Sequence, residues 1–160
     1  MVPLPVRPVL AAAILAAALA VPADLRGQAA ARARDDDIAV IVNGDVAAAA
    51  LTASEARRIF LLRQRFWPGG RRIAPVNLPA ASPLRRDFSV KLLGRTVKEL
   101  SDYWNDLYFH GTEPPPVLDS ERAVILYVSR TPGAIGYVRE GTLKGAPEHD
   151  AVKVVLTVEP

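Results

Sequence analysis

The sequence predicts a single α/β domain in which helices cover one β-sheet. Short apolar runs rich in β-branched residues, typical of buried strands, alternate with longer segments whose apolar residues recur every three or four positions. Hydrophobic residues make up 50% of the 160 residues, and no cysteine is present. The stability of the domain must therefore come from its apolar core and not from disulfides. The expected order of elements is βαβαααββ.

Four segments have the composition of strands. The first is a continuous apolar run from Ile38 that ends at Asn43-Gly44, as expected for a strand buried on both faces and closed by a turn. The second follows the glycine-containing turn at residues 66–70. The predicted strands span residues 38–42, 73–77, 134–138 and 152–158.

Four further segments have helical spacing and recognisable ends. Thr52 and Glu55 stand at the spacing of a capping box, and Ser82-Pro83 combines a capping hydroxyl with a proline suited to the first helical position. Gly94 and the Thr131-Pro132 pair are expected to end two of the helices. The predicted helices span residues 53–62, 82–94, 97–108 and 120–131.

The N-terminal segment has the features of an export signal. Arg7 is the sole charge before an apolar run from Val9 to Val21, which is too short for a bilayer span and ends in small residues. We expect residues 1–30 to be a signal peptide and flexible leader, with residues 24–36 unstructured and residues 37–160 forming the domain. Cleavage would place the mature start between Val21 and Arg34, in the periplasm or outside the cell. An uncleaved membrane anchor is the alternative.

An ordered set of short motifs lies between residues 59 and 138. They read Ile59-Phe60-Leu61, Phe66-Trp67-Pro68-Gly69-Gly70, Ser82-Pro83-Leu84-Arg85-Arg86-Asp87-Phe88, Tyr103-Trp104 and Thr131-Pro132-Gly133-Ala134-Ile135-Gly136-Tyr137-Val138. In this order they resemble the phosphate ABC transporter substrate-binding proteins, especially short, single-lobe members of that periplasmic-binding-protein-like superfamily. The resemblance implies one lobe of a type 2 periplasmic-binding-protein-like fold. It also implies a non-enzymatic protein that binds a small oxyanion such as phosphate, with an ABC transporter permease as partner.

The candidate anion site lies where strands end and helices begin, since open α/β sheets bind ligands there. Free backbone amides at the start of a helix favour anions, so Ser82 is a candidate contact, with Arg85 and Arg86 one turn inside the helix. An ordinary helix cap is the alternative interpretation of Ser82. Further candidates at the ends of strands and helices are Asn43, Thr131 and Gly133.

The resemblance extends to only one of the anion contacts of the full-length phosphate receptors. In those proteins the corresponding stretch is similar to "R.D.SGT", and only Ser82 matches it. Leu78 and Ala80 stand where the arginine and aspartate would fall, and Pro83-Leu84 replaces the Gly-Thr pair. Arg85 is therefore the expected substitute for the missing charge.

Six arginines within sixteen residues offer a second, different function. They form either a solvated surface or a surface for an anionic partner such as a lipid head group or an acidic protein, in which case the fold serves as an interaction or scaffold module. The formal net charge of +3 at pH 7 is too small to favour a dedicated nucleic-acid binder. The six residues are Arg57, Arg58, Arg63, Arg65, Arg71 and Arg72.

Other chemistries lack support in the sequence. His110 and His149 have no Cys, Asp or Glu at metal-ligand spacing on a shared face, so neither a metal nor another cofactor is expected. A Gly-x-Ser-x-Gly nucleophile motif does not occur, which argues against a serine hydrolase. Trp104 lies on an apolar helical stripe and is expected in the core, with a ligand platform as the alternative.

Overall fold

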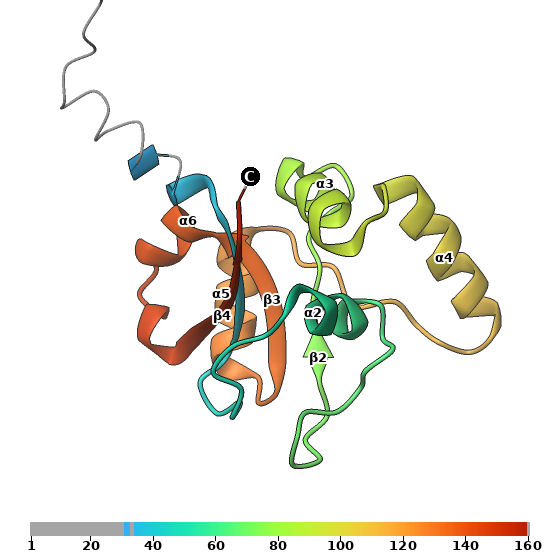
Figure 1. Ribbon diagram of the computed structural model, residues 1–160, viewed down its shortest axis with the longest axis horizontal. Helices are drawn as coiled ribbons and strands as arrows, with labels where there is room; N and C mark the ends of the chain where they lie inside the picture. Colours follow the sequence, from blue (N-terminus) through green and yellow to red (C-terminus); the bar gives the residue numbers. More distant parts are fainter. Residues whose placement is uncertain (1–30, 33, 160) are drawn as a thin grey trace, which may run out of the picture.

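The structure is a computed structural model that describes residues 31–32 and 34–159, and it confirms the α/β class (Figure 1). Strands β1 (Ile38–Asn43), β2 (Ala74–Pro75), β3 (Ala134–Arg139) and β4 (Val152–Val158) form a sheet in the order β2-β3-β1-β4. β1 runs antiparallel to both β3 and β4, whereas the short β2 runs parallel to β3. The four predicted strands are therefore all present in one sheet.

The four predicted helices are also present. α2 is Ala53–Phe60, α3 is Pro83–Phe88, α4 is Val97–Phe109 and α5 is Glu121–Arg130. A π-helical turn, Ser89–Leu93, extends α3 to Gly94, which adopts a φ of 66°. Two short elements between β3 and the end of β4 were not predicted, the helix α6 (Glu140–Lys144) and the 3₁₀ helix His149–Ala151. Their five and three residues are too few to show a helical period.

The helices lie near both edges of the sheet, and one packs directly against it. In Figure 1, α2, α3 and α4 lie toward the β2 edge, whereas α6 lies at the opposite side. α5 packs directly against β1 and β3. A Cβ atom on Gly136 would lie 2.5 Å from Val124 Cγ1 of α5, so this glycine is what allows the helix to approach the sheet so closely.

The core is centred on β1 and β3. All six residues of β1 are buried, in agreement with a strand covered on both faces. The Tyr137 ring of β3 stacks on Phe88 with ring centroids 3.7 Å apart, and Phe60 packs edge-on against both. This aromatic cluster joins α2 and α3 to the sheet and fixes the direction of α3.

The residues just before the predicted domain boundary contact the domain. Residues 34–36, expected in an unstructured leader, are helical. They contact the body of the domain, because Asp35 lies 3.2 Å from Lys144 and Asp36 lies 3.7 Å from Arg139. The predicted signal peptide lies outside the described residues. Among the residues that are described, no helix is both long and apolar enough to cross a membrane.

Candidate functional site

The predicted site residues separate into two groups at opposite ends of β3. Asn43, Thr131 and Gly133 lie at the amino end of β3, since Val42 of β1 pairs with Ile135. Arg85 lies near the carboxyl end, where its guanidinium contacts the Tyr137 hydroxyl. The structure therefore does not bring the six candidates to one site.

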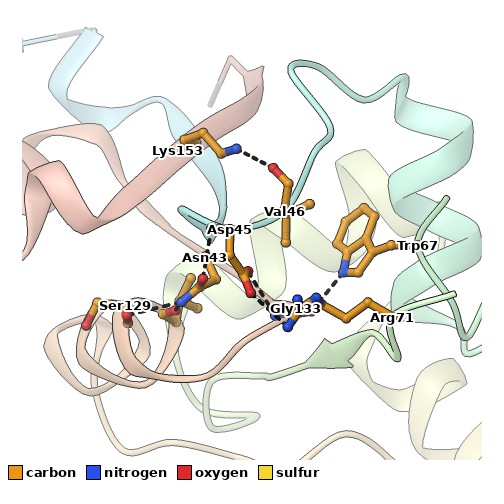
Figure 2. A network of polar contacts seen from close by, with 9 residues as sticks. Asn43, Asp45, Val46, Trp67, Arg71, Ser129, Gly133 and Lys153 are labelled. Carbon is orange, nitrogen blue, oxygen red and sulfur yellow. Dashed lines mark hydrogen bonds and ion pairs between the residues drawn. The ribbon is translucent and has the colours of Figure 1, made fainter. Parts of the chain in front are cut away.

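At the amino end of β3, Asn43 joins the end of β1 to the end of α5 (Figure 2). Its Nδ2 donates to the Val128 carbonyl at 2.8 Å and to the Ser129 carbonyl at 3.1 Å. Its Oδ1 accepts from the backbone N–H of Asp45 at 3.0 Å. The side chain thus satisfies carbonyls that the last turn of a helix leaves free, which is a structural role.

Gly133 anchors the hairpin of residues 66–72 to the sheet (Figure 2). Its carbonyl accepts from Trp67 Nε1 at 2.9 Å, and its N–H donates to Asp45 Oδ1 at 3.3 Å. Arg71 lies 2.9 Å from the other Asp45 oxygen. Gly133 has a φ of 78°, and a Cβ atom there would lie 2.4 Å from the Arg72 carbonyl oxygen. The glycine is required by both conformation and space.

Thr131 contributes to this end through its backbone. Its N–H donates to the Tyr127 carbonyl at the end of α5, and its carbonyl accepts from the N–H of Ala134 at 3.1 Å. The residue therefore makes the turn from α5 into β3. At this end of the sheet the polar groups that the structure shows are paired with one another.

A cavity of about 220 Å³ lies beyond the carboxyl end of β2. Its walls come from the end of β2, from α3 and α4, and from the proline-rich loop that follows α4. The polar residues that line it all carry hydrogen-bond donors, and none is a carboxylate. They are Asn77, Arg85, Ser101, Trp104 and Asn105.

Arg85 is the charged residue in the lining of this cavity. Only 7% of the residue is exposed, and Nη1 donates to the Tyr137 hydroxyl at 3.3 Å. No Asp or Glu among the described residues forms an ion pair with it. Buried charges in proteins are normally paired, because an uncompensated charge in a medium of low polarity is costly. The position thus favours an anion as counter-ion.

The Tyr137 hydroxyl cannot supply that negative charge. Burial raises the pKa of Tyr137 above its usual value, and the nearby Arg85 opposes this only in part. The neutral hydroxyl accepts from the N–H of Leu78 at 3.3 Å and from Arg85, and it donates to Asn77 Oδ1 at 3.4 Å. Its role is to hold the Arg85 side chain in place.

Trp104 adds a second donor without a partner. The predicted burial of its side chain is confirmed, but the structure gives its Nε1 no hydrogen-bond acceptor among the described residues. Buried indole N–H groups usually have one, and an unpaired buried donor often indicates a bound ion or water. The sequence predicted a core position for this residue but did not predict that its Nε1 would lack an acceptor. The apolar stripe predicts burial of the ring but says nothing of where its nitrogen points.

Ser82 and Arg86 lie outside this cavity. The Ser82 hydroxyl accepts from the N–H of Arg85 at 3.4 Å as the N-cap of α3, and Arg86 is exposed. Ser82 lines a separate, open depression that also contains Asp119 and Glu121. Arg122 also lines this depression, but its guanidinium lies 3.4 Å from Glu148, so the two carboxylates still make the surroundings of Ser82 less favourable for an anion than the cavity around Arg85.

Comparison with known proteins supports the fold. No family model matches the chain, and no curated protein matches it in sequence. Among solved structures, it is similar to an ABC-type phosphate transport receptor from Vibrio cholerae (TM-score 0.58, 19% identity, covering 75% of this chain and 45% of that one). It is also similar to PstS from Borrelia burgdorferi (TM-score 0.58, 20% identity, 78% and 49%). The chain thus has the predicted periplasmic-binding-protein-like fold and spans less than half the length of these structures.

Proposed function

We propose that this protein binds a small oxyanion, with phosphate as the first candidate, in the cavity lined by Arg85 and Trp104. The observation that carries the proposal is the buried Arg85 guanidinium, which has no carboxylate partner among the described residues and lines a cavity together with Trp104, whose indole N–H has no acceptor there. A tetrahedral oxyanion supplies both the counter-charge and the hydrogen-bond acceptors that this cavity lacks.

The number of available donors is sufficient for a useful affinity. Micromolar binding requires about 8 kcal/mol, whereas one hydrogen bond to a charged group contributes roughly 1.5 to 3 kcal/mol. Arg85 can make more than one such bond, because its guanidinium carries several N–H groups besides the one directed at Tyr137. Trp104 adds one more, and Asn77 and Asn105 line the same walls. Three bonds near the upper end of this range, in this partly enclosed space, meet the requirement.

The similar solved structures favour phosphate over other oxyanions as the first ligand to test. The Vibrio cholerae structure is described as an ABC-type phosphate transport receptor. By analogy, we propose a non-enzymatic, exported solute-binding protein that is linked to ABC-type phosphate uptake through a permease. Export would use the N-terminal signal, with a mature start between Val21 and Arg34. The intact mass of the periplasmic protein tests this, and retention of Met1 would favour a membrane anchor instead.

Calorimetric titration of the protein with phosphate and with sulfate tests the binding proposal. Arg85→Met should weaken binding tenfold or more, since it removes a charge together with its hydrogen bonds. Trp104→Phe should weaken binding about fivefold, because it removes one neutral donor and keeps most of the ring. The matched control is Arg86→Gln, which changes an exposed arginine one position away and should leave the affinity unchanged.

Further measurements separate this site from its alternatives. Ser82→Ala removes a cap hydroxyl and should not alter affinity; a fivefold loss would instead place the anion at the start of α3. Salt dependence is a second criterion, because a partly buried site loses less affinity with ionic strength than an exposed arginine surface does. Absence of binding by the wild-type protein at millimolar phosphate and sulfate would contradict the proposal.

An interaction or scaffold module is the second candidate function. It is favoured by Leu78 and Ala80, which stand where the resembled receptors carry charged anion contacts, and by the carboxylates beside Ser82. Under this function the cavity binds no anion, and Arg85→Met changes only stability. The titration above therefore distinguishes the two candidates directly.

A further inference from the structure

The six clustered arginines do not act as one group. Arg71 pairs with Asp45, and the Arg57 Nε donates to the Leu92 carbonyl at 2.8 Å. Arg58 bonds to side chains near its own helix. Arg63, Arg65 and Arg72 remain exposed and form no ion pair with any carboxylate of the described chain. The surface available to an anionic partner is therefore smaller than the sequence cluster.

Arg65 and Arg72 meet the end of α4 at a second cavity, of about 280 Å³. Arg65 Nη2 donates to the Thr112 hydroxyl at 3.3 Å, which links the α2–β2 loop to the loop after α4. Gly111 and Glu113 also line this cavity. The Glu113 carboxylate forms no ion pair with either arginine, so two positive charges face one negative charge.

Three exposed aromatic residues belong to the two segments that line this cavity or directly adjoin them. Phe66 is 58% exposed, follows Arg65 directly and pairs with Arg72 across the hairpin. Tyr108 and Phe109 end α4 shortly before Gly111 and are 62% and 85% exposed. In Figure 1 the α2–β2 loop reaches the lower side of the molecule and α4 ends at its right side, and the Arg65–Thr112 hydrogen bond links the two segments. We call the set formed by Arg65, Arg72, Phe66, Tyr108 and Phe109 the basic-aromatic surface.

We propose that the basic-aromatic surface binds an anionic phospholipid membrane. Guanidinium groups attract the negative surface and hydrogen-bond lipid phosphate, while aromatic rings prefer the headgroup layer, where one side is apolar and the other is wet. The positive excess at the cavity and the exposed rings beside it match these two requirements together. Exposed aromatic residues gathered beside basic ones are otherwise unfavourable in water and indicate a binding surface. This inference concerns a surface separate from the Arg85 cavity.

Flotation with vesicles of neutral phosphatidylcholine, or of the same lipid with added phosphatidylglycerol, tests the proposal. The wild-type protein should float with the anionic vesicles only. Arg65→Gln with Arg72→Gln should weaken partitioning about 30-fold, on the expectation of roughly fivefold for each basic residue near the surface. Phe109→Ala should also weaken it several-fold. All variants share the same N-terminus, so differences among them report on this surface.

Matched controls lie elsewhere on the surface. Arg86→Gln and Val90→Ala change an exposed arginine and an exposed apolar residue away from the basic-aromatic surface, and Arg85→Met changes the oxyanion cavity. None of the three should alter flotation. Equal binding to neutral vesicles, no binding to either, or binding that the double arginine variant retains would overturn the proposal. So would binding to polyglutamate without binding to vesicles, which would indicate an acidic protein partner.

Discussion

Two buried tryptophans, Trp67 in the hairpin of residues 66–72 and Trp104 in α4, differ in the environment of their indole nitrogens. Near the amino end of β3, Trp67 Nε1 donates to the Gly133 carbonyl at 2.9 Å (Figure 2). Trp104 Nε1 has no acceptor among the described residues, and Trp104 lines the same cavity as Arg85, which has no carboxylate partner among those residues either. Hydrogen-bond donors that are paired with acceptors of the protein stabilise the fold, whereas a cavity lined by unpaired donors indicates a site for a ligand that supplies acceptors.

The largest effect is expected from removing the Trp104 side chain. Its ring packs in the core beside Leu100 and Tyr103, so Trp104→Ala should lower the free energy of unfolding by about 3 to 5 kcal/mol. Denaturant unfolding monitored by circular dichroism measures this. A loss below 1 kcal/mol would show that the ring contributes little to the core and would restore a ligand-platform role for it.

Asn43→Ala should have the next largest effect. It leaves the Val128 and Ser129 carbonyls and the Asp45 N–H without their side-chain partner, which should cost about 1 to 3 kcal/mol of unfolding free energy. The control is Asn105→Ala, an exposed asparagine at the other end, where we expect almost no change in stability. Equal stability of the two variants would show that the hydrogen bonds of Asn43 do not stabilise the fold.

The same substitution at the two tryptophans tests the comparison most directly. Trp67→Phe and Trp104→Phe remove similar volumes, but only the first loses a hydrogen bond. Trp67→Phe should therefore be less stable than Trp104→Phe by about 1 kcal/mol, measured by unfolding in phosphate- and sulfate-free buffer. Added phosphate should then stabilise the Trp67 variant more than the Trp104 variant, since only the latter lacks a proposed anion contact.

The smallest effect is expected at Arg71. Its ion pair with Asp45 joins side chains that are 51% and 34% exposed, so Arg71→Gln should cost under about 1 kcal/mol. The difference from wild type should shrink further in molar salt, because salt screens exposed charges. Unfolding at low and high ionic strength measures both. A loss as large as that of Asn43→Ala would show that the hairpin depends on this ion pair more than on the Trp67 anchor.

Local signals in the sequence were sufficient for most of the fold. A continuous apolar run predicted β1, because the residues of a strand that is buried on both faces are apolar throughout and do not alternate with polar ones. Thr52 and Glu55 form the predicted capping box, and Ser82 caps α3 as expected. Gly94 ends the helical segment that begins with α3, as expected, and adopts a positive φ. Each of these features depends on a few neighbouring residues, which is why the sequence alone reveals them.

The site depended on contacts between distant segments. Ser82 and Arg85 are only three positions apart. Leu84, Arg85 and Phe88 of α3 are buried, whereas Ser82 is the N-cap at the start of this helix and is partly exposed. The sequence analysis expected them to act on one anion, and the structure gives them separate cavities. A shared position on a helix cannot show which cavity each side chain reaches.

The sequence by itself determined the class of fold, the positions of the main strands and helices, their caps, and a resemblance to phosphate-binding receptors. Only the tertiary structure decided which polar groups find partners. It paired Arg71 with Asp45 and Trp67 with Gly133, and it placed Arg85 and Trp104 in the lining of one cavity, without a carboxylate for the first or an acceptor for the indole N–H of the second among the described residues. The physical reason is that helix and strand formation depend on local periodicity, whereas the pairing of buried polar groups depends on long-range packing.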